Sequence, residues 1–190
     1  MNNKRGSIVV IKGSMFSGKT DELVRRLERE SYRPGGKSQA FKPAFDTRYA
    51  DEHIVTHNQK QFPCTVFSSV RSLLDIVDPD TTLVGIDEAQ FSDPTHPEEL
   101  YTVCILLAKS GRDVWLSCLS QDYRGEPFKN VAYVLAVANK VIEKTAVCSV
   151  CGSDEAMYSQ LLETGHTDQL LLGAKGRYDA RCAQCFVPAP

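Results

Sequence analysis

Eight residues near the start of the sequence have the types and spacing of a phosphate-binding loop. Residues 13–20 are Gly-Ser-Met-Phe-Ser-Gly-Lys-Thr, which fits the pattern G-x-x-x-x-G-K-[S/T]. The glycines allow the backbone to curl until successive N–H groups point at one phosphate. Lys19 is then placed to neutralise charge on the β- and γ-phosphates, and the Thr20 hydroxyl to ligate Mg²⁺. The loop therefore predicts a site for a nucleoside triphosphate.

A pair of acidic residues follows an apolar run later in the chain. Residues 83–86 are Leu-Val-Gly-Ile, and Asp87 and Glu88 come directly after them. Ligands gather at the carboxyl edge of an open parallel sheet, so Asp87 is placed for a second contact with magnesium. Glu88 beside it can take a proton from a nucleophile. Together with the phosphate-binding loop, the pair indicates phosphoryl transfer.

These two motifs leave the acceptor of the phosphoryl group open. If Glu88 polarises water, the protein is an ATPase, and if it deprotonates an alcohol, the protein is a kinase. A GTPase is disfavoured because the guanine-reading sequence Asn-Lys-x-Asp is absent. Residues 139–142 begin that sequence but read Asn-Lys-Val-Ile.

Four of the seven cysteines have the spacing of a metal site. Cys148 and Cys151 form one Cys-x-x-Cys pair, and Cys182 and Cys185 form a second pair thirty residues later. Four thiolates close the tetrahedral shell of Zn²⁺, which makes the predicted site structural rather than catalytic. A redox dithiol or plain buried cysteines are the alternatives. The other three, which stand alone in apolar stretches, are expected to be small core residues: Cys64, Cys104 and Cys118.

The composition excludes several other classes of protein. Of the 190 residues 42% are hydrophobic and 24% charged, which excludes a disordered or collagenous chain. Lys and Arg number 22 against 24 Asp and Glu, whereas a protein that grips a phosphate backbone is usually basic. No apolar run reaches the roughly 18 residues that span a bilayer, and the run at 8–11 is too short for a signal peptide. We therefore expect a cytoplasmic protein whose main partner is neither a nucleic-acid polymer nor a membrane.

The segments around these motifs alternate between strand and helix patterns. Short apolar runs predict strands, and apolar residues at helical spacing predict helices. Strands are expected at 7–11, 38–41, 65–67, 82–86, 114–119 and 140–145, and helices at 19–31, 69–77, 97–110 and 131–138. The alternation predicts a P-loop α/β fold, with a parallel sheet and helices on both faces.

Two further segments are interpreted from their composition. Residues 42–61 have no clear period, so we expect a long functional loop there. The charged run at 25–30 is expected to be a solvated helix face.

The composition changes after Thr145, which predicts two units, 1–145 for the nucleotide and 146–190 for the metal. The second unit carries three basic and five acidic residues, which argues against a nucleic-acid module. It is too short to fold reliably on a hydrophobic core of its own. We expect one zinc ion to make it a lid over the nucleotide site.

Five ordered motifs resemble the type II thymidine kinase family over nearly the whole chain. The first is the loop at 13–20 with its Met-Phe-Ser-Gly-Lys core. The others are Lys-Pro-Ala-Phe-Asp-Thr-Arg-Tyr at 42–49, Asp-Glu-Ala-Gln-Phe at 87–91, Asp-Tyr-Arg-Gly-Glu-Pro-Phe at 122–128, and the cysteine module with Thr-Ala-Val-Cys at 145–148 and Tyr-x-x-x-Cys at 178–182.

The resemblance implies ATP-dependent phosphorylation of the 5′-hydroxyl of thymidine to give dTMP. It also implies a RecA-like core, Mg²⁺, structural Zn²⁺, a homotetramer and feedback inhibition by dTTP. Two rival hypotheses remain open. One is an ATPase or nucleotide switch whose zinc module binds a protein, and the other is a kinase for another deoxynucleoside.

The family's functional residues transfer to matching positions here. Glu88 becomes the base that takes the 5′-OH proton, with Arg48 and Lys19 also catalytic and Asp46 near the reacting centre. The ATP site implied by the motifs comprises Gly13, Ser14, Met15, Phe16, Ser17, Gly18, Lys19, Thr20, Asp87, Glu88, Ala89 and Gln90. The nucleoside site comprises Asp46, Leu119, Tyr123, Phe128 and Tyr178, with backbone hydrogen bonds to the base from Leu170, Leu171, Leu172 and Gly173.

The sequence departs from the family pattern in two places. Where the family commonly has Gly-Leu-Asp, residues 118–120 are Cys-Leu-Ser, so a carboxylate is missing. In the lid, residues 173–178 are Gly-Ala-Lys-Gly-Arg-Tyr, where Ala174 tolerates a positive φ less well than glycine. Both changes bear on the shape of the base pocket rather than on the type of reaction.

Overall fold

A parallel sheet forms the centre of the molecule in a computed structural model, which describes residues 5–44, 52–56, 59–163, 169 and 176–188. The strands of this six-stranded sheet are β1 (Ile8–Gly13), β2 (Ser38–Pro43), β5 (Thr65–Phe67), β6 (Leu83–Ile86), β7 (Asp113–Cys118) and β8 (Lys140–Lys144). Their order is β5-β2-β6-β7-β1-β8, and every neighbouring pair is parallel. The carboxyl ends of all six strands therefore meet at one edge.

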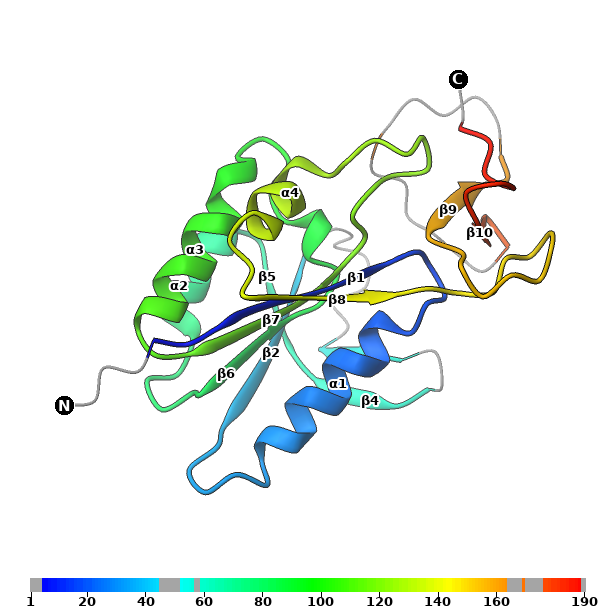
Figure 1. Ribbon diagram of the computed structural model, residues 1–190. Helices are drawn as coiled ribbons and strands as arrows, with labels where there is room; N and C mark the ends of the chain where they lie inside the picture. Colours follow the sequence, from blue (N-terminus) through cyan, green and yellow to red (C-terminus); the bar gives the residue numbers. More distant parts are fainter. Residues whose placement is uncertain (1–4, 45–51, 57–58, 164–168, 170–175, 189–190) are drawn as a thin grey trace.

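Helices cover both faces of this sheet (Figure 1). The helix α1 (Lys19–Glu30) lies on one face, and α2 (Leu73–Ile76), α3 (Pro97–Lys109) and α4 (Lys129–Leu135) lie on the other. Two 3₁₀ turns, η1 (Val70–Ser72) and η2 (Ala89–Phe91), complete the connections. The predicted P-loop α/β fold is thus confirmed.

Alternation along the strands divides the core into two layers. In β7, Val114 and Leu116 face α3 and α4, whereas Trp115 between them packs with α1. In β1, Val10 belongs to the layer that contains α3 and α4, and Ile11 belongs to the layer that contains α1. A strand whose successive side chains point to opposite faces needs apolar residues on both faces when helices cover both. This requirement explains the continuous apolar runs that predicted these strands.

The charged run at 25–30 is not a solvated face throughout, so that interpretation was wrong. Arg26 and Glu30 are buried, with 9% and 3% of their surface exposed. The Arg26 Nη1 atom lies 2.8 Å from a Glu30 carboxylate oxygen, and its guanidinium carbon lies 5.2 Å from the centre of the Trp115 ring. Glu30 also accepts a hydrogen bond of 2.9 Å from the Thr82 hydroxyl. Pairing at i,i+4 and stacking on an aromatic ring allow both charges to be buried.

Short strands account for most of the other differences from the sequence prediction. The segment 42–61, expected to be a loop, contains β3 (His53–Val55), which pairs antiparallel with β4 (Gln61–Pro63). Three-residue strands are too short to show a period. The expected helix at 69–77 is instead η1 followed by the single turn of α2.

The C-terminal segment contains a two-stranded antiparallel sheet of β9 (Tyr158–Leu161) and β10 (Tyr178–Arg181). Figure 1 shows this pair beyond the carboxyl ends of β1 and β8. We call residues 146–163 and 176–188 the cysteine module. Within the described ranges, no helix is long and apolar enough to cross a membrane.

Candidate functional site

The phosphate-binding loop joins the end of β1 to the start of α1, as the sequence predicts. A Cβ atom on Gly13 would lie 2.1 Å from the Lys144 carbonyl oxygen of β8, so this position has no room for a side chain. Gly18 has a φ of 77°, in the left-handed region that glycine adopts without strain. The Ser17 hydroxyl donates a hydrogen bond of 2.8 Å to the Ser14 carbonyl oxygen and braces the loop from inside.

Lys19 is buried at the base of this loop, with 8% of its surface exposed. Its ammonium group donates a hydrogen bond of 2.7 Å to the Ser14 carbonyl oxygen. Burial lowers the pKa of Lys19, while the nearby Glu88 and Asp87 carboxylates act in the opposite direction. A bound phosphate would add to the counter-charge that these carboxylates supply to the buried ammonium group.

Thr20 and Asp87 bring two oxygen ligands together at the sheet edge. The Thr20 hydroxyl, in the first turn of α1, lies 3.2 Å from one oxygen of Asp87, which follows β6. Burial raises the pKa of Asp87 to about 6, and the adjacent Glu88 adds to this effect. Hydroxyl and carboxylate oxygens are the ligands that Mg²⁺ prefers, so the pair fits the metal predicted for it.

Glu88 follows Asp87 with an unusual backbone conformation. Its φ of 50° and ψ of 40° lie in the left-handed region, where non-glycine residues are uncommon. The turn η2 begins directly after it. Its carboxylate accepts a hydrogen bond from the side-chain amide of Gln90.

A cavity of about 540 Å³ opens beside these residues. Ten predicted site residues line it: Met15, Phe16, Gly18, Lys19, Thr20, Glu88, Leu119, Tyr123, Phe128 and Tyr178. The phosphate-binding residues and the expected nucleoside pocket therefore share one hollow, which reaches from the phosphate-binding loop to the cysteine module.

Aromatic side chains form part of the cavity wall. Tyr123, Phe128 and Tyr178 are buried, and Tyr123 and Tyr178 cluster with Leu161 of β9. Burial raises the pKa of Tyr178, so its hydroxyl stays neutral near pH 7. These residues provide a largely apolar, aromatic lining that suits an aromatic base.

A tight turn at 121–127 fixes Tyr123 in that wall. The buried Asp122 carboxylate accepts hydrogen bonds from the backbone N–H groups of Arg124 at 2.8 Å and Glu126 at 2.9 Å. Gly125 has a φ of 82°, and a Cβ atom there would approach the Phe186 ring of the cysteine module to 3.4 Å. The turn is thus braced from within and packed against the module.

The other predicted site residues either fall outside the described residues or do not line the cavity. Arg48, Asp46, Leu170, Leu171, Leu172 and Gly173 fall outside the described residues. Among the described ones, Gly13, Ser14, Ser17, Asp87, Ala89 and Gln90 do not line the cavity. Ala89 and Gln90 are almost fully buried, at 0% and 1% exposure.

The cavity also has walls formed by residues that were not among the predicted site residues. They come from Asp21, Val55, Thr56, Gln59, Phe91, Gln121, Asp122, Ser159 and Gln169. Asp122 and Phe91 belong to motifs quoted above, and Val55 to Gln59 fall in the segment expected to be functional. Ser159 carried no signal because its role depends on a tertiary contact.

That contact joins the cysteine module to the phosphate-binding loop. The Ser159 hydroxyl accepts a hydrogen bond of 3.0 Å from the Met15 backbone N–H. The buried Ser14 hydroxyl donates one of 2.8 Å to the Ala156 carbonyl oxygen. Residues more than 140 positions apart in the chain thus fix the same loop.

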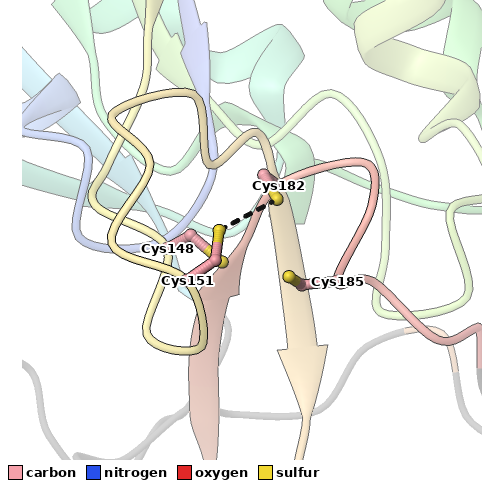
Figure 2. A group of neighbouring side chains, drawn as sticks. All are labelled: Cys148, Cys151, Cys182 and Cys185. Carbon is pink, nitrogen blue, oxygen red and sulfur yellow. Dashed lines mark hydrogen bonds between the residues drawn. The ribbon is translucent and has the colours of Figure 1, made fainter.

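The four predicted metal ligands lie together in the cysteine module (Figure 2). Their sulfur atoms all lie within 4.8 Å of one another, and those of Cys151 and Cys182 are 3.6 Å apart. A tetrahedral ion with Zn–S bonds of about 2.3 Å requires sulfur atoms about 3.8 Å apart. Cys148, Cys151, Cys182 and Cys185 therefore fit zinc in both chemistry and spacing.

The remaining cysteines lie outside this cluster. Cys104 and Cys118 are buried in the main core, and burial raises the pKa of each thiol to about 12. Cys64 is half-buried beside the α1 layer. These positions agree with small apolar residues rather than ligands.

Comparisons with known proteins agree with this geometry. A family model described as thymidine kinase matches residues 6–186. A thymidine kinase of Rhodothermus sp. (strain ITI 518) is 42% identical over 183 residues, which cover 96% of this chain and 82% of the relative. Thymidine kinases of Bacteroides thetaiotaomicron and Bacteroides fragilis (strain YCH46) are 40% and 37% identical, over 98% of this chain and 89% of each relative. The chain therefore belongs to the thymidine kinase family.

Proposed function

We propose that this protein transfers the γ-phosphoryl group of ATP to the 5′-hydroxyl of thymidine, giving dTMP and ADP. The observation that carries the proposal is the shared cavity. Lys19, Thr20 and Glu88 line it together with the aromatic side chains of Tyr123 and Tyr178. An acceptor with an aromatic base fits this hollow, whereas activation of water needs no such wall. Membership of the thymidine kinase family supports the same acceptor.

Glu88 acts as the general base in this proposal. It accepts the proton of the 5′-hydroxyl while that oxygen bonds to the γ-phosphorus. The bond from the γ-phosphorus to the β,γ-bridging oxygen breaks, and ADP leaves. Lys19 and the N–H groups of the phosphate-binding loop neutralise the charge that collects on the phosphoryl oxygens.

Thr20 and Asp87 hold the nucleotide's metal ion in this scheme. Magnesium, when bound there, neutralises charge on the β- and γ-phosphates. The resemblance adds Arg48 and Asp46 near the reacting centre. It also adds backbone contacts from 170–173 to the base.

The cysteine module acts as the structural unit that carries the aromatic lid. We propose the division at 145/146, with residues 1–145 binding ATP and 146–190 closing over the nucleoside. Tyr178, at the start of β10, lies four residues before the ligand Cys182. Zinc, when bound by the four sulfurs, cross-links β10 to the segment at 148–151. Closure excludes water, which favours transfer to the alcohol over hydrolysis.

We include three further properties in the proposal: the resemblance supports a homotetramer and feedback inhibition by dTTP, and the composition supports a cytoplasmic location. Light scattering after gel filtration tests the first. Inhibition of dTMP formation by added dTTP tests the second.

The substrate is tested by comparing nucleosides at equal concentration with MgATP. We expect dTMP formation to exceed phosphorylation of deoxycytidine, deoxyadenosine and deoxyguanosine, because the chain belongs to the thymidine kinase family. Faster phosphorylation of another deoxynucleoside would show that this nucleoside, and not thymidine, is the substrate. ADP production at the same rate with and without any of the nucleosides would favour the ATPase.

A further inference from the structure

The backbone of Glu88 needs support from its surroundings. A left-handed φ of 50° is sparsely populated for a residue with a Cβ atom, and it persists where neighbouring groups over-determine it. The conformation turns the chain from the end of β6 into η2 and leaves the Glu88 side chain in the cavity. Two buried side-chain amides contact this turn and its carboxylate.

Gln90 is the first of these groups. It is 1% exposed, and both the nitrogen and the oxygen of its side-chain amide form hydrogen bonds. The nitrogen donates to a Glu88 carboxylate oxygen, and the oxygen accepts a hydrogen bond of 3.0 Å from the Leu119 backbone N–H. Leu119 lines the cavity just beyond β7. Gln90 therefore links the carboxylate of the proposed base to the wall of the nucleoside pocket.

Asn130 is the second group that holds this turn. It is 4% exposed in the first turn of α4, two residues after Phe128 of the cavity wall. Its side-chain nitrogen lies 3.0 Å from the Gln90 carbonyl oxygen and 2.8 Å from that of Ser92, with Ala89 at 3.4 Å. A single buried amide thus restrains the carbonyl groups of η2.

We propose that Gln90 and Asn130 are positioning residues, which set the Glu88 carboxylate relative to the nucleoside pocket. This inference rests on the proposed function of Glu88 as the base. It assigns Gln90 a role different from the ATP contact that the family motif implies. It also gives a role to Asn130, which lies outside the quoted motifs. Both act through Glu88, because neither lines the cavity among the described residues.

The consequence is a specific kinetic pattern. Misplacing a catalytic group by about 1 Å can cost roughly 100-fold in rate, even when the substrates still bind. We therefore expect Gln90→Met, which keeps the length but removes both hydrogen bonds, to lower kcat about 10- to 100-fold. The KM for ATP should stay within about twofold, because the phosphate-binding loop is untouched.

A double-mutant cycle with Glu88→Gln tests whether Gln90 and Asn130 act through the Glu88 carboxylate. Single-turnover dTMP formation is measured for Gln90→Met and Asn130→Ala, each with Glu88 intact and with Glu88→Gln. If both residues act through the carboxylate, each should add less than about twofold to the loss in Glu88→Gln, because residues that act as a unit are non-additive. Asn139→Ala is the matched control. Asn139 accepts a hydrogen bond of 2.7 Å from the Ile8 N–H at the amino end of the sheet.

The outcomes separate this inference from the proposed function. Losses that multiply in the Glu88→Gln background would overturn the positioning role, as would a large rise in the KM for ATP with unchanged kcat. If Asn130→Ala does not fold, Gln90→Met still decides the result. A wild-type protein that forms no dTMP would remove the proposed function itself, independently of either variant.

Discussion

The cavity is built by two regions whose stability has different sources. The main core buries large side chains such as Phe41, Leu100 and Leu116 between a parallel sheet and its helices. The buried cluster around the cysteines consists of three alanines and two of the cysteines themselves, Ala146, Ala156, Ala180, Cys148 and Cys182. Each large apolar side chain contributes about 1.5–3 kcal/mol on burial, and an alanine much less. The core can therefore stand on hydrophobic burial, whereas the module buries few large side chains, such as Leu161 and Tyr178, and we expect it to depend more on its sulfur cluster.

The two regions nevertheless meet at the most constrained part of the site. The Ser14 hydroxyl of the phosphate-binding loop donates a hydrogen bond to the module, and the Ser159 hydroxyl of the module accepts one from the loop. The Gln121 side-chain amide of the 121–127 turn donates to the Met157 carbonyl oxygen of the module at 3.3 Å. In the proposed function, the core supplies the reacting groups and the module supplies the enclosure. The following variants test that division.

The largest expected effect is the loss of a reacting group from the core. Glu88→Gln keeps the shape of the side chain but removes the base, so kcat for dTMP formation should fall about 10²- to 10⁴-fold. ATP binding and zinc content should persist, because the phosphate-binding loop and the four cysteines are unchanged. Rapid-quench assays with isothermal titration of ATP measure both quantities. Retained activity would mean that another group takes the proton.

A smaller effect is expected from breaking the module. Cys182→Ser removes one of the four sulfurs, so bound zinc per chain should fall and kcat/KM for thymidine should drop about 10- to 100-fold as the lid loses its position. The helices should persist, because every helix in the described part of the chain lies before residue 136. Elemental analysis, circular dichroism and kinetics follow these three properties.

Cys64→Ser is the control for that variant, because Cys64 lies outside the sulfur cluster. It should keep both zinc and activity. If Cys182→Ser melted the helices together with the module, the two regions would not be separately stabilised.

The smallest effect is expected where the two regions touch. Ser14→Ala removes the hydrogen bond to Ala156 and should raise the KM for ATP about 2- to 10-fold, since a typical hydrogen bond contributes about 0.5–1.5 kcal/mol. Zinc content should stay the same. Ser72→Ala, which removes an exposed hydroxyl bonded to the Ser69 carbonyl oxygen, provides the comparison. Equal KM values in the two variants would show that the module touches the loop without supporting it.

Local patterns predicted much of this molecule. The α/β fold could be predicted because buried strands such as β1 and β6 are continuous apolar runs, and helices such as α1 and α3 have clear apolar stripes. The phosphate-binding loop and the cysteine pairs could be found because their ligands are close in sequence. Whether each carried-over residue contacts its substrate stays a prediction.

What was missed depends on contacts between distant segments. The strands β3, β4, β9 and β10 have three or four residues each, too few for a period. The burial of Arg26 and Glu30 requires Trp115 and Thr82 from other elements. Ser159 and Asn130 gain their roles from partners that no local spacing indicates.

The most direct test of the account is the fate of the γ-phosphoryl group in a single reaction. Wild-type protein is incubated with MgATP and thymidine, and labelled γ-phosphate is divided between dTMP and inorganic phosphate. Nearly all the label should enter dTMP, and omission of thymidine should almost abolish ADP release, because one cavity joins Glu88 to the proposed nucleoside pocket. Release of inorganic phosphate at the same rate with and without thymidine would contradict the account.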